Sequence, residues 1–202
     1  MAKLFANMKK RLTITLLAYE EYKKQLSGED LEFWHRLSIQ SAQRFSKLYP
    51  KDPRTATVLI KVVDDLFKKE QYKQASTFAK RILVIVPDSD VRARRQAMII
   101  LAHTDFDSGQ YKEAENMYAS ALKLTPEDDE NRTALVDRLA ASVYKQGEQL
   151  REFGNLEGSS TLFLKVASLA PLSAIRVTAD YDAAVNMIEI KSWDKAIELL
   201  EA

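Results

Sequence analysis

The two histidines, His35 and His103, are the side chains best suited to acid–base chemistry near neutral pH. Asp107 follows His103 by one helical turn, so the two side chains could touch on a helix. His35 lies within residues 33–36, a run that contains Phe and Trp, and we expect it at the edge of the core or on the surface. One His–Asp pair supplies neither three metal ligands nor a nucleophile with its base and orienting group. We therefore expect no catalytic residue and no enzyme.

Other kinds of reactive site also find no support in the sequence. The chain has no cysteine, which excludes disulfides, thiolate metal sites and a cysteine nucleophile. Its five glycines are scattered singly, so no phosphate-binding loop is present. The acidic run at residues 127–130 lacks the glycine-centred loop of a calcium site and instead favours the start of a helix. We expect no metal and no cofactor.

The charge balance narrows the class of partner. Thirty basic residues against 29 acidic residues leave a formal charge of +1, so we expect no binding of nucleic acid. No apolar run approaches the roughly 18 residues that a membrane span needs, so we expect this segment not to insert directly into a membrane. The short apolar run Leu12–Ala18, preceded by three basic residues, predicts an amphipathic first helix.

An internal repeat in the sequence indicates which secondary-structure elements position the candidate side chains. Three prolines, Pro87, Pro126 and Pro171, each follow an aromatic residue or a leucine at one constant interval. These starting residues are Tyr72, Tyr111 and Leu156, and each is followed three places on by a small residue: Ala75, Ala114 and Ser159. Trp193 and Ala196 begin a fourth copy, which is incomplete. The starting positions show that the spacing between successive copies is unequal, and longest before Leu156.

The copy at residues 96–126 resembles the tetratricopeptide repeat (TPR) family. It has the family's small residues Ala102 and Ala114, the turn glycine Gly109, the aromatic Tyr118, the pair Ala121-Leu122 and the closing Pro126. The resemblance implies antiparallel helix pairs, because small residues let two helices approach closely and proline ends the second helix. Every spacing exceeds the family's usual repeat of about 34 residues, so we expect residues 130–153 to form one lengthened helix. A second extension, over residues 90–94, would be capped by Asp88 or Ser89.

We therefore predict an all-α fold, a right-handed superhelical solenoid of TPR-like helix pairs with about four to five repeats, the last incomplete. The whole chain, 1–202, is expected to be a single domain and a fragment of a longer chain. Its parts would be a degenerate N-terminal helical pair at 1–53 and repeats at 56–89, 95–128, 140–173 and 177–202.

A TPR-like stack is expected to bind a partner along the wall lined by the first helix of each pair. Aligning the copies on their prolines places twelve side chains there. They are Ile60, Asp64 and Lys68, then Ile99, His103 and Phe106, then Tyr144, Glu148 and Arg151, and finally Tyr181, Val185 and Ile188. This mixture of aromatic, charged and aliphatic side chains suits a peptide or a helix, although Tyr144 and Tyr181 could equally pack against neighbouring repeats with their hydroxyls in solvent. The lysine- and asparagine-based carboxylate clamp found in some TPR domains is absent from these positions.

Two functions remain open. The first is a non-enzymatic protein–protein interaction scaffold that binds a peptide, a helix or a partner subunit through the groove. The alternative is a structural or regulatory helical arm of a larger enzyme or cell-envelope assembly. The irregular spacing resembles bacterial envelope TPR proteins, which favours a periplasmic or envelope location over the cytoplasm. Apolar surface on the incomplete last repeat could also drive self-association.

Overall fold

The computed structural model describes residues 7, 18, 19, 21–88 and 90–201. The amphipathic helix expected at Leu12–Ala18 lies outside these residues, except for Ala18. In the described part the chain forms helices and no strands, which confirms the all-α prediction. The helices are α2 (Gly28–Leu48), α3 (Arg54–Lys68), α4 (Tyr72–Ile85), α5 (Val91–Asp107), α6 (Tyr111–Lys123), α7 (Arg132–Glu152), α8 (Leu156–Leu169), α9 (Ala174–Glu189) and α10 (Trp193–Leu200).

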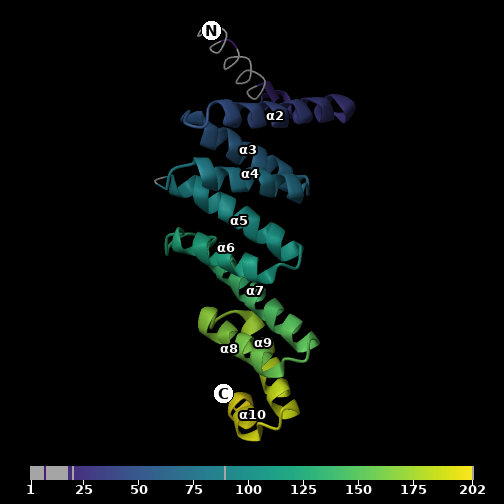
Figure 1. Cartoon of the computed structure of the whole chain (residues 1–202), viewed down its shortest axis with the longest axis vertical. Coiled ribbons are helices and arrows are strands. Elements are labelled where there is room, and N and C mark those ends of the chain that lie inside the picture. Colours follow the sequence, from purple (N-terminus) through teal and green to yellow (C-terminus); the bar gives the residue numbers. More distant parts are fainter. Residues whose placement is uncertain (1–6, 8–17, 20, 89, 202) are drawn as a thin grey trace. The chain divides into compact units, whose positions relative to one another are not determined.

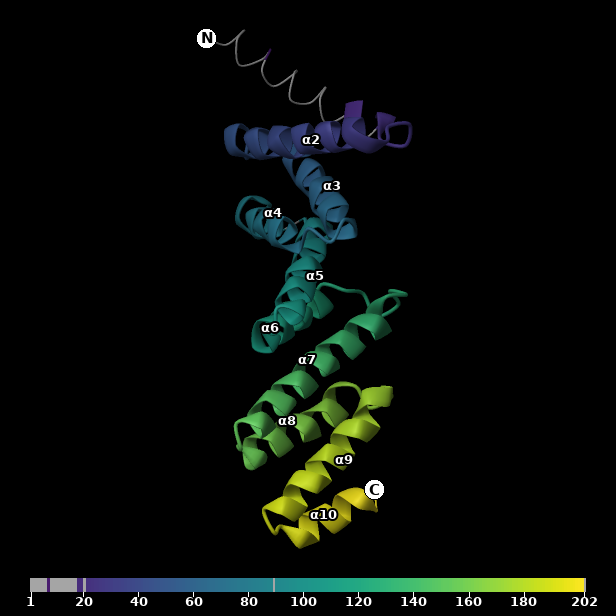
Figure 2. The ribbon, with the colours of Figure 1, turned by 90° about the vertical axis from the view of Figure 1, so that its right-hand side faces the viewer.

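The chain divides into two compact units, residues 1–100 and residues 101–202, and the boundary lies inside α5. In the first unit α3 and α4 form a tightly packed pair, and α2 packs on α3 (Figure 1). In the second unit α7 packs against α6 and α8, and α9 packs against α8 and α10 (Figure 2). A short turn reverses the chain within the packed pairs α3–α4, α7–α8 and α9–α10, as the repeat predicts (Figure 2). The lengthened helix expected at residues 130–153 is observed as α7.

The turn inside each helix pair has the same backbone geometry in all four copies. The residue two places before the second helix has a positive φ: Glu70 (58°), Gly109 (75°), Gly154 (77°) and Lys191 (58°). The next residue donates its N–H to a carbonyl five residues back, as in Gln110 to Asp105 at 2.8 Å. This pair of features is the Schellman arrangement, which satisfies the last carbonyls of the first helix. Only Gly109 was identified as a turn residue from the sequence. Glu70 and Lys191 give no such signal because they are not glycine, and Gly154 was overlooked.

Small side chains lie where the helices of a pair cross. Ala75, Ala114 and Ser159 are fully buried and Ala196 is nearly so, as the repeat predicts. On α7 the crossing is closer still, because a Cβ added to Gly147 would lie 2.6 Å from Cε1 of Phe163. Gly147 precedes Pro171 by the same interval that separates Ala102 from Pro126, so it occupies the small-residue position of its own repeat.

The core of the second unit forms around this crossing. Phe163 of α8 is fully buried among small and branched side chains of α7, α8 and α9. Their members are Ala140, Val143, Val166, Ala170, Ala179 and Ala183. Alanines on α7 and α9 thus leave room for one aromatic ring, and this large-and-small packing fixes how α7 and α9 lie on either side of α8.

One detail of the expected capping is wrong. The helix after Pro87 begins at Val91, and its N-cap is Asp90, whose Oδ1 accepts a hydrogen bond from the backbone N–H of Ala93 at 3.1 Å. We expected Asp88 or Ser89 because the helix was assumed to include Asp90. Asp88 instead lies with its Oδ1 3.2 Å from Nε of Arg94.

Candidate protein-binding surface on α7 and α9

The first helices α7 and α9 of two successive pairs are joined by a polar network in the second unit. The hydroxyl of Tyr144 donates a hydrogen bond to Oδ2 of Asp182 at 2.6 Å. Arg151, two turns further along α7, donates from an Nη atom to the other oxygen, Oδ1, at 3.2 Å. Its second Nη atom lies 3.8 Å from Oε1 of Glu189, near the end of α9. One aspartate of α9 therefore holds two of the predicted groove residues of α7.

Burial and this hydrogen bond both act on Tyr144. The ring packs against Phe163 with 5.1 Å between centroids, and its hydroxyl points to Asp182 and not to solvent. Burial raises the pKa of Tyr144 far above its ordinary value, and the bond to the Asp182 carboxylate raises it further. The phenol thus remains a proton donor at any physiological pH. Glu148, on the same face of α7, forms an i,i+3 ion pair with Lys145 at 2.6 Å.

Beside this network α9 exposes apolar side chains. Val177 is 74% exposed, Tyr181 60% and Ile188 40%. At about 100° per residue these positions lie within about 40° of one another on the helix. Tyr181 and Ile188 directly precede Asp182 and Glu189 in the sequence, so the apolar stripe borders the charged one. We call the residues Tyr144, Glu148, Arg151, Tyr181, Asp182, Ile188 and Glu189 the α7–α9 face.

The other predicted groove residues lie elsewhere and are mostly engaged. Oδ1 of Asp64 on α3 accepts from Nε2 of Gln96 on α5 at 3.0 Å, and burial raises the pKa of this carboxyl. Lys68 is the last residue of α3 and is exposed. Phe106 packs edge-on against Tyr111 across the turn, with 5.2 Å between ring centroids. Ile60, Ile99 and Val185 are half-buried.

His103 is tied into the interior of its own helix pair. Its Nδ1 lies 2.8 Å from the hydroxyl of Tyr118, a fully buried residue of α6. Burial lowers the pKa of His103, and nearby Arg138 lowers it further against an opposing effect of Asp107. Asp107 is thus close enough to act electrostatically. The neutral imidazole serves to satisfy the tyrosine hydroxyl inside the pair.

Two polar clusters were missed in the sequence. In the first unit, Nδ1 of His35 lies 2.7 Å from Oδ2 of Asp65, and the hydroxyl of Tyr19 donates to the same oxygen at 2.9 Å. His35 is buried and does not lie on the surface. Burial is the main cause that lowers the pKa of His35, and the positive charge of Lys69 lowers it further.

In the second unit, Glu115 accepts from Lys165 at 2.7 Å, from Gln146 at 2.8 Å and from Lys112 at 2.9 Å. Partial burial alone would raise the pKa of Glu115, but these three hydrogen bonds outweigh it and lower the pKa to about 2. The cluster ties α6, α7 and α8 together. Asp65 and Glu115 each join residues of other helices that lie far away in the sequence, where no sequence pattern indicates contact.

Neither cluster has the composition of a metal site. Among the described residues no group of three or more His, Cys, Asp or Glu side chains is arranged to hold a metal ion. In the same part of the chain no helix is both long and apolar enough to cross a membrane.

Comparison with known proteins identifies the fold. No family model matches the sequence, and no curated protein matches it significantly. Among solved structures, a kinesin-light-chain-type protein of Podosopora anserina with nearly identical TPR-like repeats aligns over 96% of this chain and 93% of its own, with a TM-score of 0.51 and 16% identity. A variant of that protein gives a TM-score of 0.51 at 15% identity, over 96% of this chain and 92% of that one. The chain therefore has a TPR-like helical-repeat fold.

Proposed function

We propose that the chain is a non-enzymatic protein–protein interaction scaffold and that the α7–α9 face holds a peptide or helix of a partner protein. The observation that carries the proposal is the exposed apolar stripe of α9 beside the Arg151–Asp182–Glu189 network. Exposed aromatic and aliphatic side chains next to an arginine are typical of the centre of a binding surface. The stripe lies on a first helix, the part of a TPR-like pair from which the sequence predicts binding.

The network favours recognition because it is already ordered without a partner. Tyr144 and Arg151 are held by Asp182, so little side-chain entropy is lost when a ligand docks on them. Arg151 spans two carboxylates, and a guanidinium has five N–H donors, which leaves donors for a partner's carboxylate or backbone carbonyl. A partner segment with one apolar anchor for Tyr181 and Ile188 and one acceptor for Arg151 fits this surface.

The test compares the wild-type chain with surface variants as bait in native extract. We expect Tyr181→Glu with Ile188→Glu to abolish capture of a specific partner, because two carboxylates would enter the apolar contact. Val84→Glu is the matched control, since Val84 is also an exposed apolar residue on a helix but lies on α4. Equal capture by the double variant and the wild type would remove the α7–α9 face from the proposal. Circular dichroism must show that all three proteins keep the same helicity.

The alternative, a structural arm of a larger assembly, is favoured by one observation on α10. Ile197 and Leu200 are 55% and 56% exposed, whereas the residues at the same repeat positions are buried in the three earlier copies. These counterparts are Ser76 and Ala79, Glu115 and Tyr118, and Ser160 and Phe163. A further helix, packed on α10 as α9 packs on α8, would bury both apolar side chains.

Self-association and a helical partner make different predictions for α10. If a second copy covers this surface, the mass measured by light scattering rises with protein concentration, and Ile197→Glu with Leu200→Glu returns the chain to a monomer. A constant monomer mass at high concentration would exclude self-association through α10. Capture that is lost in this variant but kept in the Tyr181 and Ile188 variant would favour the arm over the scaffold.

A further inference from the structure

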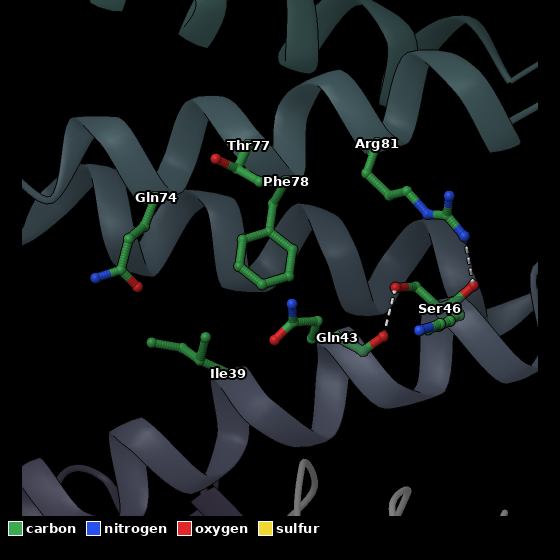
Figure 3. Close-up of a pocket in the computed structure, with 8 residues that line it drawn as sticks. Ile39, Gln43, Ser46, Gln74, Thr77, Phe78 and Arg81 are labelled. Atoms are coloured by element: carbon green, nitrogen blue, oxygen red, sulfur yellow. Dashed lines mark hydrogen bonds between the residues drawn. The ribbon is translucent and has the colours of Figure 1, made fainter.

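A groove of about 420 Å³ lies between α2 and α4 in the first unit, away from the first helices that carry the proposed function. Figure 3 shows its walls: Ile39, Gln43 and Ser46 project from α2, and Gln74, Phe78 and Arg81 project from α4. Lys47 also lines it. Of its apolar residues, Ile39 is half-buried and Phe78 is buried, whereas Gln43 and Gln74 are exposed.

The charged side chains that line this groove, Lys47 of α2 and Arg81 of α4, are both basic, and further cations lie on the same two helices. Residues 37–48 of α2 contain Arg44 and Lys47 and no Asp or Glu, and α4 contains Lys73, Lys80 and Arg81 and no Asp or Glu. None of these five cations forms an ion pair with another described residue. The chain as a whole is nearly neutral, with 30 basic and 29 acidic residues, so the excess of basic side chains is local to this surface.

The second unit shows how the same repeat position is neutralised elsewhere in the chain. Lys165 of α8 stands six residues before Pro171, as Arg81 stands six residues before Pro87. The ammonium of Lys165 lies 2.7 Å from Oε1 of Glu115, on the preceding second helix α6. Glu115 is eleven residues before its proline, and the residue eleven before Pro50 is Ile39.

Figure 3 shows Arg81 at the end of the groove near Ser46, and no carboxylate of the described residues forms an ion pair with it. Its one hydrogen bond to a described residue runs from Nη2 to the backbone carbonyl of Ser46, 3.2 Å away (Figure 3). A guanidinium has five N–H donors, so most of its capacity for a carboxylate is unused. The internal counter-charge present in the second unit is missing in the first.

We infer that this groove binds an acidic polypeptide segment, whose carboxylates supply the counter-charge that Arg81 and Lys47 do not have among the described residues. Arg81 and Lys47 lie at one end of the groove and receive the carboxylates, and the amides of Gln43 and Gln74 bond the peptide backbone. Ile39, which is half-buried, contacts an aliphatic side chain of the segment. Phe78 is only 8% exposed and offers no open ring face on which a nucleotide base could stack, which favours a peptide over a nucleic acid.

The test measures binding of a fluorescein-labelled peptide, Gly-Glu-Glu-Leu-Asp-Glu-Gly, by fluorescence anisotropy at low salt. A peptide with Gln and Asn in place of its acids, and an oligothymidylate of equal charge, are the comparison probes. We expect the acidic peptide to bind, the neutral peptide not to bind, and affinity to fall as added salt screens the charges. Lys47→Gln with Arg81→Gln should weaken binding by at least about tenfold. Lys123→Gln with Lys195→Gln, which removes two exposed cations from the second unit, should leave it unchanged.

Replacement of Arg81 also removes its hydrogen bond to the carbonyl of Ser46, so a second pair of variants tests the groove with Arg81 in place. Ile39→Glu places a carboxylate in the lining of the groove, where it repels the carboxylates of the peptide, and we expect it to weaken binding. Ile39→Gln, which alters the lining without adding charge, should retain most of the affinity. Equal binding of the acidic and neutral peptides, equal binding by Ile39→Glu and Ile39→Gln, or tighter binding of the oligothymidylate would each overturn the inference.

Discussion

Replacement of Gly147 by alanine tests the helix crossing on which the second unit depends. The added methyl group would lie 2.6 Å from Cε1 and 2.7 Å from Cδ1 of Phe163, well inside van der Waals contact. Phe163 is fully buried, so its ring cannot move aside without displacing α9. Overpacking of this kind costs about 1–3 kcal/mol, whereas alanine in place of glycine inside a helix gains up to about 1 kcal/mol. We expect a net loss of about 1–2 kcal/mol in the free energy of unfolding.

The assay is chemical denaturation followed by circular dichroism for the wild type, Gly147→Ala, Phe163→Leu and the double variant. Phe163→Leu alone should destabilise the fold by leaving a cavity, but in the double variant the smaller side chain makes room for the methyl group. The two losses should therefore add to more than the loss in the double variant, by at least about 0.5 kcal/mol. A Gly147→Ala protein as stable as the wild type, or losses that simply add, would refute a close contact at this crossing.

Four further predictions follow from particular contacts. Glu115→Gln should lower stability at neutral pH and flatten acid unfolding, because a carboxyl whose pKa is about 2 in the fold loses its contribution as pH falls from about 4.5 toward 2. His35→Gln should weaken the fall in stability below about pH 6.5, where the unfolded chain binds protons that the buried imidazole does not. Asp182→Asn should lower the pKa of Tyr144, read from the phenolate absorbance during alkaline titration. Lys191→Gly should raise the melting temperature, because glycine adopts φ of 58° without the strain that lysine bears.

The repeat could be predicted from the sequence because its signals are local. A proline follows the last residue of α4, α6 and α8 by two or three positions, and a small residue such as Ala114 marks each crossing, so neither signal depends on distant parts of the chain. The same reasoning predicted the length of α7. The cap at Asp90 was missed because helix ends are the least certain feature of a periodic pattern, and a shift of one residue changes which side chain caps.

The contacts between helices were harder to predict. Aligning repeats groups residues that point in the same direction, such as Tyr144 and Tyr181, which hold the same position in successive copies. The observed partner of Tyr144 is Asp182, one residue beyond Tyr181, because neighbouring first helices touch through their flanks and not through equivalent positions. Glu115 and Asp65 were missed because their partners lie on other helices, far away in the sequence. Among the predicted groove residues, the structure places Tyr144, Glu148 and Arg151 together on α7, and their use in binding stays a prediction.

The most direct measurement of the central claim places a photo-crosslinking amino acid at Tyr181 and, as a control, at Thr161 on the exposed surface of α8. Both residues are exposed and lie in the second unit. The two positions therefore differ only in the surface on which the crosslinker sits. If the α7–α9 face holds a partner, irradiation in native extract joins one protein to the chain labelled at position 181 and not to the chain labelled at 161. Identical products from both positions, or none from position 181 while the intact chain still captures a partner, would contradict the account.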